Sequence, residues 1–519
     1  MDKKQLPIGV SSFRETIEEN YYYVDKTMLI DEILSKKTKV VLFTRPRRFG
    51  KTLNMTMIKE FFDISLDSKE LFKGLKIENS PYYNQINTAP VIFFSFRDCK
   101  GGKAYLVANM KREIYSQYEK YAFIRESLDN NKKNTMDRIV SNLIDSSYEN
   151  LQDVCISLQF LTQIVNQYYK KPVILLIDEY DTPMISAYTE KCYEELRSFF
   201  STLYSSALKD NVYLKQALLT GIQRVAKENI FSGLNNIIVS SVASTGYAKH
   251  FGLLEEETEK LLNYYDLELN DQVKSMYDGY NFGGYEMYNP WSVLNYANEK
   301  KLMPYWINTS SNMLIRECIQ QGHTDFKEDF EKLIAEGTAD VSLKTETSFF
   351  ELKDTSTLWG LLLSSGYITL TNDKADFDRL QRTVKIPNRE VKQEFRTIVA
   401  QYAKINESSL EEMFDALLYL KDIEKFKKVY KKIILNNTSF HDARENAYHM
   451  LFLGMCIYLD GYYVVKSNIE AGKGRSDIYL KAKTNEYPNL IIEFKYGEDL
   501  EKLALEAIKQ IQDKQYYAD

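Results

Sequence analysis

Short apolar segments alternate with amphipathic stretches over residues 1–300. Four short, largely apolar segments have the pattern of buried strands, and they lie at residues 40–43, 91–96, 173–177 and 214–220. Helical spacing of apolar residues follows the first of them, at residues 53–62, and long helical connections separate the others. Continuous apolar strands joined in this way are typical of a parallel sheet that helices cover on both faces. The pattern therefore predicts one large α/β domain over residues 1–300.

The pattern changes twice after residue 300. Residues 301–404 favour helices and a hairpin-like stretch around Gly366, which resembles a winged-helix module; a plain helical connector is the alternative. Residues 405–519 begin with helices, the last of them at 445–459. They continue with segments that predict three strands and a helix, at residues 462–469, 476–480, 490–495 and 500–517. The last stretch is therefore expected to form a small α+β domain.

A phosphate-binding loop is indicated directly after the first predicted strand. The sequence TRPRRFGKT at residues 44–52 ends in Gly50, Lys51 and Thr52, which is how a Walker A loop ends between a strand and a helix. Backbone N–H groups and a lysine suit phosphate oxygens, and a hydroxyl suits Mg²⁺. Arg45 stands where the pattern has its first glycine, so a surface turn that only ends in GKT is the alternative. We expect ATP to bind here, with Arg48 of the same loop among its ligands.

Two adjacent carboxylates end the third predicted strand. Asp178 and Glu179 follow the apolar run of residues 173–177, and the buried end of a strand is a costly place for two acids unless a cation lies there. In P-loop ATPases an aspartate at this place holds Mg²⁺ and the next glutamate polarises the attacking water. Asp178 is thus predicted to bind the metal and Glu179 to be the catalytic base, with Asp181 as the next candidate. Acids that only face solvent at a strand end are the alternative.

The fourth predicted strand ends in polar groups where P-loop ATPases have a sensor of the γ-phosphate. Thr220 could orient water, and the planar guanidinium of Arg224 could stabilise charge in the transition state. A solvated arginine after a turn is the alternative.

An acid and a lysine lie on one face of a predicted strand near the C-terminus. Side chains alternate along a strand, so Glu493 and Lys495 share a face, and Asp477 lies sixteen residues earlier across a predicted hairpin. Asp477 and Glu493 would bind Mg²⁺, and Lys495 would position the nucleophile or stabilise the leaving charge. A cross-strand ion pair without chemistry is the alternative. The unbroken apolar run at 490–492 favours a central strand, where unpaired acids would be costly.

Composition limits the classes of protein that fit. A chain of 519 residues is expected to form two to four domains, and a net charge of -6 argues against a histone-like basic coat. The start MDKKQLPIGV has no apolar core of a signal peptide, and no apolar run approaches the length of a membrane span. Five scattered cysteines without a CxxC pair fit a reducing compartment, and four separated histidines give no zinc site. We therefore expect a cytoplasmic protein.

Several motifs together resemble a bacterial and archaeal group, the AAA-ATPase-like proteins that carry a PD-(D/E)XK nuclease-like domain at the C-terminus. The matching segments cover nearly the whole chain: LPIGVSSF at 6–13, YVDKT at 23–27, RPRRFGKT at 45–52, LIDEYD at 176–181, LTGIQR at 219–224, FSGLNN at 231–236, YDGY at 277–280 and YNPW at 288–291. Arg45 belongs to the group's own pattern. The stretch FGLL at 251–254 departs from its FGFT signature, and we attach no function to it.

The resemblance implies additional residues near the C-terminal site. Glu445 on the preceding helix is expected to be a further metal ligand, Glu470 is a second candidate, and Gln510 on the following helix is expected near the site. The superfamily core usually has another strand after this helix, so the domain is expected to lack it or to be completed by another segment.

Two classes of function stay open on these grounds. The first is an ATP-binding and ATP-hydrolysing protein coupled to a Mg²⁺-dependent nuclease that acts on DNA or RNA. The second is a nucleotide-gated switch whose nuclease-like domain binds DNA or a partner without cutting. A degenerate P-loop domain would bind no nucleotide at all.

Overall fold

A computed structural model describes residues 3–145, 147–148, 151–224, 237–306, 324–344, 354–371, 381–402, 407–435, 452, 455–459, 462–471, 474–495 and 499–514. The chain divides into two compact units. The first consists of Met1–Trp306 with Leu343–Asn372, and the second of Ile307–Ser342 with Asp373–Asp519.

A five-stranded parallel sheet organises the first unit. Its order is β2-β3-β4-β1-β5, and its strands are β1 (Val40–Thr44), β2 (Val91–Ser95), β3 (Val173–Asp178), β4 (Leu214–Gly221) and β5 (Ile237–Ser240). The four strands expected from the apolar pattern are confirmed. The sequence pattern did not indicate β5, because this strand has four residues and Ile238 is exposed.

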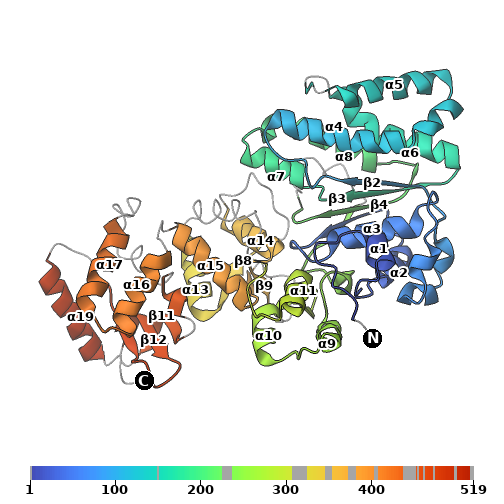
Figure 1. Ribbon diagram of the computed structural model, residues 1–519. Helices are drawn as coiled ribbons and strands as arrows, with labels where there is room; N and C mark the ends of the chain where they lie inside the picture. The colour runs from blue at the N-terminus through green and yellow to red at the C-terminus, as the bar shows by residue number, and fades with distance from the viewer. Residues whose placement is uncertain are drawn as a thin grey trace. The chain divides into compact units, whose positions relative to one another are not determined.

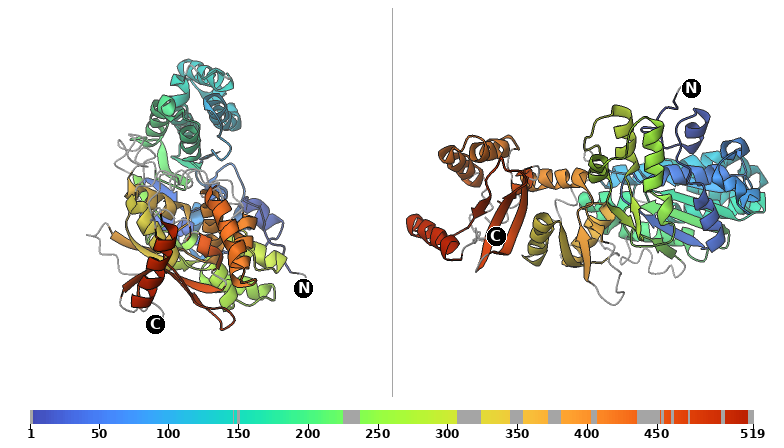
Figure 2. Two further views of the ribbon diagram at one scale, coloured as in Figure 1. Left: turned by 90° about the vertical axis from the view of Figure 1, so that its left-hand side faces the viewer. Right: turned by 90° about the horizontal axis from the view of Figure 1, so that it is seen from below.

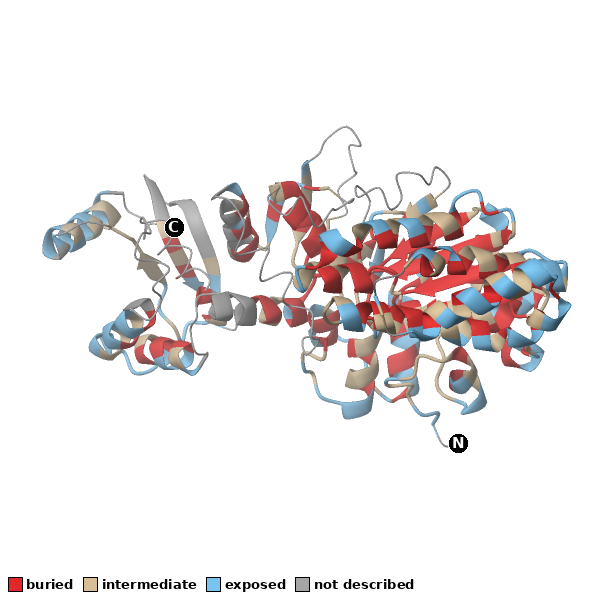
Figure 3. Ribbon diagram, turned by 90° about the horizontal axis from the view of Figure 1, so that it is seen from above, coloured by how far each residue is buried: buried red, intermediate tan, exposed pale blue. Residues whose placement is uncertain are grey.

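Helices cover both faces of this sheet, as expected for a parallel sheet (Figure 1). One layer holds α1 (Phe13–Glu18), α2 (Met28–Lys36) and α3 (Lys51–Phe62). The other holds α4 (Lys103–Lys120), α5 (Asn130–Ile144), α6 (Gln152–Tyr169), α7 (Thr182–Thr189) and α8 (Tyr193–Leu208). Buried residues concentrate along the strands between the layers (Figure 3). A buried cluster that includes Phe13, Phe43, Ile58 and Leu176 fills the space between the sheet and the first layer.

Side chains of α4 and of the residue after it satisfy backbone groups of the outer strand β2. The backbone N–H of Phe93 donates to Gln117 Oε1 at 3.3 Å, and the Val91 carbonyl accepts from the Tyr121 hydroxyl at 2.8 Å. An edge strand with open backbone groups invites pairing with another chain, so these bonds make β2 a poor edge for such pairing.

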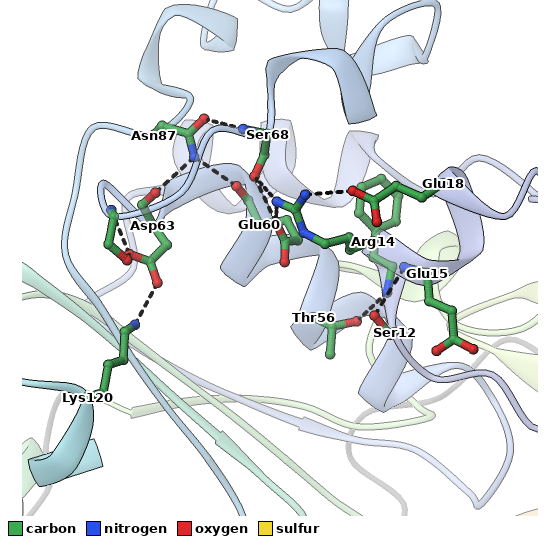
Figure 4. Close-up of polar contacts among 12 residues, drawn as sticks. Ser12, Arg14, Glu15, Glu18, Thr56, Glu60, Asp63, Ser68, Asn87 and Lys120 are labelled. Carbon is green, nitrogen blue, oxygen red and sulfur yellow. Dashed lines mark hydrogen bonds and ion pairs between the residues drawn. The ribbon is translucent and has the colours of Figure 1, made fainter. Parts of the chain in front are cut away.

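A polar network ties α1 to the far end of α3 (Figure 4). Arg14 donates to Glu60 at 2.6 Å and to Ser68 at 3.1 Å, and Ser68 also donates to Glu60. Close by, Lys120 pairs with the buried Asp63 at 2.7 Å. The helix that begins at the phosphate loop is therefore anchored at its C-terminal end by ion pairs to two neighbouring elements.

The rest of the first unit surrounds the loop between β1 and α3. It comprises α9 (Glu255–Tyr264), α10 (Asp271–Tyr277), β6 (Tyr280–Phe282), β7 (Tyr285–Met287), α11 (Pro290–Glu299), α14 (Thr355–Ser365) and β9 (Thr369–Leu370). A second buried cluster, with Leu261, Val293 and Tyr288 among its members, joins α9, α10 and α11.

Among the described residues, the strands of the second unit form antiparallel pairs in two places. In the first, β8 (Thr338–Ser342) pairs with β10 (Gln381–Lys385). In the second, β11 (Tyr463–Ala471), β12 (Gly474–Ala482) and β13 (Leu490–Ile492) follow one another in a sheet. Its helices are α13 (Thr324–Glu336), α15 (Arg389–Tyr402), α16 (Glu407–Leu418), α17 (Ile423–Leu435) and α19 (Leu500–Lys514) (Figure 2). The mixed α/β class with small antiparallel sheets near the C-terminus is confirmed.

The expectation of a central buried strand at residues 490–492 is wrong within the described sheet. There β13 lies at the edge next to β12, and its three residues are only half-buried. Leu490 and Ile492 of the apolar run pack against a buried cluster that includes residues of β12, α16 and α17, and one-sided packing is enough to select apolar residues. The predicted helix at 445–459 lies largely outside the described residues.

No helix in the described ranges combines the length and the apolar character that crossing a bilayer requires. Four cysteines are buried free thiols in the structure, namely Cys99, Cys155, Cys192 and Cys456. The domain boundaries expected at residues 300 and 404, and the winged-helix hypothesis, stay predictions.

Candidate nucleotide-binding and metal-binding sites

The loop between β1 and α3 has the geometry of a phosphate loop. Gly50 adopts a left-handed conformation with φ of 81° and caps the N-terminus of α3. A Cβ at Gly50 would meet no atom within 4 Å, so glycine is favoured here for its backbone conformation rather than for space. The open N-terminus of α3 offers backbone N–H groups and a positive dipole end to an anion.

Lys51 lies inside this loop with its ammonium group on loop carbonyls. Its Nζ donates to the carbonyl oxygens of Arg45 at 3.0 Å and Pro46 at 2.9 Å, and the side chain is buried. Burial lowers the pKa of Lys51, while the neighbouring acids Glu179 and Asp178 oppose this shift. A buried ammonium group held only by neutral carbonyls and nearby acids is suited to bind a phosphate anion.

Arg45, which replaces the first glycine of the pattern, anchors the loop to β5. Its guanidinium donates to Ser240 O at 2.6 Å and to Ser240 Oγ at 3.0 Å, and it lies 5.0 Å from the ring centre of Phe251. The side chain is fully buried, and burial lowers the pKa of Arg45 to about 9. Its guanidinium thus binds Ser240 of β5, which explains why an arginine fits at this position.

Thr52 and Asp178, the predicted metal ligands of the ATPase site, meet Thr220 at the carboxyl ends of β3 and β4. Asp178 Oδ2 accepts a hydrogen bond from Thr52 Oγ1 at 2.7 Å, and Asp178 Oδ1 accepts one from Thr220 Oγ1. Burial raises the pKa of Asp178, and the two hydroxyl bonds oppose that shift. A carboxylate and two hydroxyl oxygens in contact form the hard oxygen set that Mg²⁺ prefers.

Glu179 follows directly and stands in a strained backbone position. Its φ is 51°, a left-handed value that is uncommon outside glycine. Its backbone N–H donates to Thr220 Oγ1 at 3.2 Å, and its Oε2 accepts from Thr182 Oγ1 at 3.0 Å. The side chain is half-buried. Backbone strain of this kind clusters at functional sites, which agrees with a functional role for this acid.

Arg224 lines a pocket beside the end of β1. The other lining residues come from β1, the segment after β5, and α14: Thr44, Ser241, Val242, Gly360, Leu363 and Ser364. Burial lowers the pKa of Arg224. The structure therefore brings this arginine to the same edge of the sheet as the phosphate loop.

Aromatic residues from later segments hold the outer side of the loop. The Arg48 guanidinium lies 3.9 Å from the ring centre of Trp291, and Trp306 Nε1 donates to Arg47 O at 3.4 Å. Arg48 also has a positive φ of 66°. No local sequence pattern indicates the contact between Arg48 and Trp291, because the two residues are 243 positions apart and only the fold joins them.

The stretch FGLL at 251–254 packs directly on the phosphate loop. Gly252 N donates to Phe49 O at 3.2 Å, and a Cβ on Gly252 would lie 3.0 Å from the Phe49 ring. Asn54 of α3 donates to His250 O at 2.8 Å. This segment, to which the sequence attached no function, is thus a structural support of the loop.

The C-terminal site forms where β12 and β13 meet. Ile478 pairs with Ile492, so Asp477 lies opposite Glu493 by the antiparallel register. Asp477 Oδ2 accepts a hydrogen bond from Phe494 N at 2.7 Å. The hairpin predicted to bring the two acids together is present, although β13 ends at Ile492.

Glu493 is the centre of this site. Its Oε1 accepts from Lys495 Nζ at 3.0 Å and from the Gln510 amide of α19. Only 2% of its side chain is exposed, and within the described residues its buried Oε2 has no hydrogen-bond partner. Burial raises the pKa of Glu493, Lys495 opposes that shift, and the nearby Asp477 adds to it. A buried carboxylate oxygen without a donor is costly, and a divalent cation would satisfy it.

The structure brings together Asp477, Glu493, Lys495 and Gln510, as the sequence and the resemblance indicated. Glu445 lies outside the described residues. Glu470 lies on β11, opposite Arg475, and its side chain lies outside the described part.

Comparison with known proteins identifies two family matches along the chain. Residues 7–231 match the family model described as Predicted AAA-ATPase. Residues 443–519 match the model of the PD-(D/E)XK nuclease superfamily. A protein of Azotobacter chroococcum mcd 1, named "Uncharacterized protein in vnfD 5'region", is 27% identical over 404 residues, which cover 76% of this chain and 69% of that relative. The chain thus contains an AAA-ATPase-like segment at residues 7–231 and a segment of the PD-(D/E)XK nuclease type at residues 443–519.

Proposed function

We propose that this protein binds and hydrolyses ATP in its first unit and cleaves nucleic acid at the site of Asp477 and Glu493. The observation that carries the proposal is the contact of Thr52, Asp178 and Thr220 beside the phosphate loop. Two ATPase-type motifs distant in sequence converge there. The two family matches support the same coarse activities. The location that we propose is the cytoplasm, and the buried free thiols of the four described cysteines support it.

In the proposed ATPase site, each side chain has a distinct part. Lys51 would exchange its two carbonyl partners for phosphate oxygens, while the N-terminus of α3 receives the phosphates. Thr52 and Asp178 would hold Mg²⁺, which neutralises charge on the phosphates when bound. Glu179 would accept the proton of the attacking water, and Arg224 would stabilise the charge that develops on the γ-phosphate.

In the proposed nuclease site, Asp477 and Glu493 would hold a divalent cation. The unpartnered Oε2 of Glu493 supports this assignment. Such a cation supplies an activated water and charge stabilisation on the scissile phosphate. Lys495 would exchange its bond to Glu493 for the attacking water or the phosphate, and Gln510 would keep the Glu493 carboxylate in orientation.

A nucleotide-gated switch without cutting is the second candidate. It is favoured by the ion pair between Lys495 and Glu493 at 3.0 Å, which engages the lysine that cleavage requires. Residues 442–519 also contain ten Lys+Arg against thirteen Asp+Glu, a balance that does not favour tight nonspecific binding of nucleic acid.

Paired assays on one preparation test the proposal. Wild-type protein is assayed for ATP turnover and for Mg²⁺- or Mn²⁺-dependent cleavage of DNA and RNA, beside Lys51→Ala, Asp477→Ala and Lys495→Ala. Lys51→Ala should lose ATP turnover and nucleotide-dependent thermal stabilisation. Asp477→Ala and Lys495→Ala should lose cleavage and keep ATP turnover.

The outcomes separate the candidates. Cleavage that survives in both C-terminal variants would place the nuclease activity elsewhere or in a contaminant. Nucleotide binding by wild type with neither turnover nor cleavage would favour the switch. Absence of nucleotide binding would identify a degenerate phosphate-loop domain.

A further inference from the structure

Asp181 is a buried acid beside the proposed ATPase site that the mechanism above does not use. It ends the motif LIDEYD, and only 1% of the residue is exposed. Its Oδ2 accepts two backbone hydrogen bonds, from Ile222 N at 2.8 Å and from Gln223 N at 2.9 Å. Both donors belong to the segment that directly follows β4.

Other bonds fix the same short segment from two sides. From the β3 side, the Tyr180 hydroxyl donates to Gln223 O at 2.7 Å, and Tyr180 N donates to Thr220 O at 2.9 Å. From the phosphate loop, Arg45 N donates to Gly221 O at 3.1 Å. The segment 220–223 thus links the acids of β3 to the phosphate loop, and Arg224 is its next residue.

Asp181 and Tyr180 pack tightly against the backbone at Gly221. A Cβ on Gly221 would lie 2.8 Å from Asp181 Oδ1 and 2.7 Å from Tyr180 Cε1, closer than such atoms approach. Burial raises the pKa of Asp181 to about 6, and the two backbone N–H groups oppose that shift. The buried carboxylate is thus held in place by the backbone N–H groups that directly follow β4.

We propose that Asp181 is a positioning residue for ATP hydrolysis: by holding the amides of Ile222 and Gln223 it sets the places of Thr220 and Arg224 at the phosphate loop. The inference rests on the proposed ATPase function. Asp181 acts through the backbone and not as the base, because Oδ2 is engaged by two N–H donors. Glu179 keeps the role of the base.

Asp181→Asn and Asp181→Ala separate positioning from charge. An amide oxygen accepts both N–H bonds as a carboxylate does, so Asp181→Asn should keep kcat within about threefold of wild type. Asp181→Ala removes the acceptor, and misplacement of catalytic groups by about 1 Å costs on the order of 100-fold in rate. We expect Asp181→Ala to lower kcat by about 10–100-fold while the Kd for ATP changes little, because Lys51 and the N-terminus of α3 are intact.

A matched control removes a buried acid far from the site. Asp63 is also 1% exposed, and it accepts bonds from Ser65 N at 3.0 Å and Lys120 Nζ at 2.7 Å. Asp63→Ala should lower thermal stability without lowering kcat. As an independent structural readout, hydrogen exchange at the amides of Ile222 and Gln223 should rise in Asp181→Ala and stay low in Asp181→Asn.

Three results would overturn the inference. Asp181→Asn as slow as Asp181→Ala would assign the effect to charge or to proton transfer. Hydrolysis by Asp181→Ala at the wild-type rate would show that Asp181 does not position the catalytic groups. An equal loss of kcat in Asp63→Ala would show that the loss in Asp181→Ala comes from general destabilisation. If wild type hydrolyses no ATP, the proposed function fails and this inference fails with it, whereas the other results contradict the inference alone.

Discussion

Gly221→Ala should perturb the ATPase site through a single methyl group. Gly221 ends β4, between the acids of β3 and the phosphate loop. The added Cβ would lie 2.7 Å from Tyr180 Cε1 and 2.8 Å from Asp181 Oδ1. Both neighbours are buried and held by hydrogen bonds to Gln223 and Ile222, so neither can move without breaking those bonds.

The expected loss of stability follows from this overlap. Carbon atoms in contact lie at about 3.5–4.0 Å, so the methyl group is more than half an ångström too close. Overpacking of a rigid interior costs about 1–3 kcal/mol. A domain of about 150–250 residues loses about 2–4 °C in Tm per kcal/mol, and larger units lose less. The first unit is larger than this, so we expect a drop of about 1–5 °C, together with slower ATP turnover because Thr220 is displaced.

Thermal unfolding and ATP turnover are measured together, with Gly102→Ala as the control. Gly102 caps α4, has no positive φ, and a Cβ there meets no atom within 4 Å. This control should lose about 0.5–1 kcal/mol through the poorer N-cap and keep the wild-type rate. Gly221→Ala with the Tm and the rate of Gly102→Ala would refute the packing that we describe between β3 and β4.

Three further predictions concern other contacts. Trp291→Ala should weaken ATP binding by about 2–30-fold, the equivalent of one cation–π contact. In an Arg48→Ala background the same change should have no further effect on ATP binding. Equal losses of affinity in both backgrounds, measured by titration, would contradict the coupling. Gln510→Ala should slow metal-dependent cleavage and leave ATP turnover unchanged, because it frees the Glu493 carboxylate; an unchanged cleavage rate would exclude this role. Burial opposes ionisation of Glu32, but three hydrogen bonds together lower its pKa to about 2. Its stabilisation should be complete above about pH 4.5 and be lost as the pH falls toward 2, so Glu32→Gln should lower Tm clearly at pH 7, less at about pH 3 and little at about pH 2.

Local patterns were enough for much of the first unit. The strands β1 and β3 are fully buried and β2 is largely buried, so their apolar runs are continuous and easy to recognise. The strand β4 is also largely buried, although Lys215 and Gln216 interrupt its apolar residues. Gly50, Lys51 and Thr52 are adjacent in sequence, so their joint role follows from spacing alone. In contrast, β5 has only four residues and is partly exposed, so its sequence shows no clear alternation of apolar and polar residues.

Contacts between distant segments could not be predicted in this way. Arg45 binds Ser240 and Arg48 stacks on Trp291, and no local pattern links these pairs. Near the C-terminus, the apolar run of β13 indicated burial correctly for one face. It did not distinguish a central strand from an edge strand, because one-sided packing selects the same residues.

ATP turnover by Glu179→Gln tests the central claim most directly. This change removes the proposed base and keeps its shape, while the ligands Lys51, Thr52 and Asp178 stay intact. The account predicts that the variant binds ATP with the wild-type Kd and hydrolyses it slower by about 100-fold or more. Hydrolysis by Glu179→Gln at the wild-type rate would contradict it.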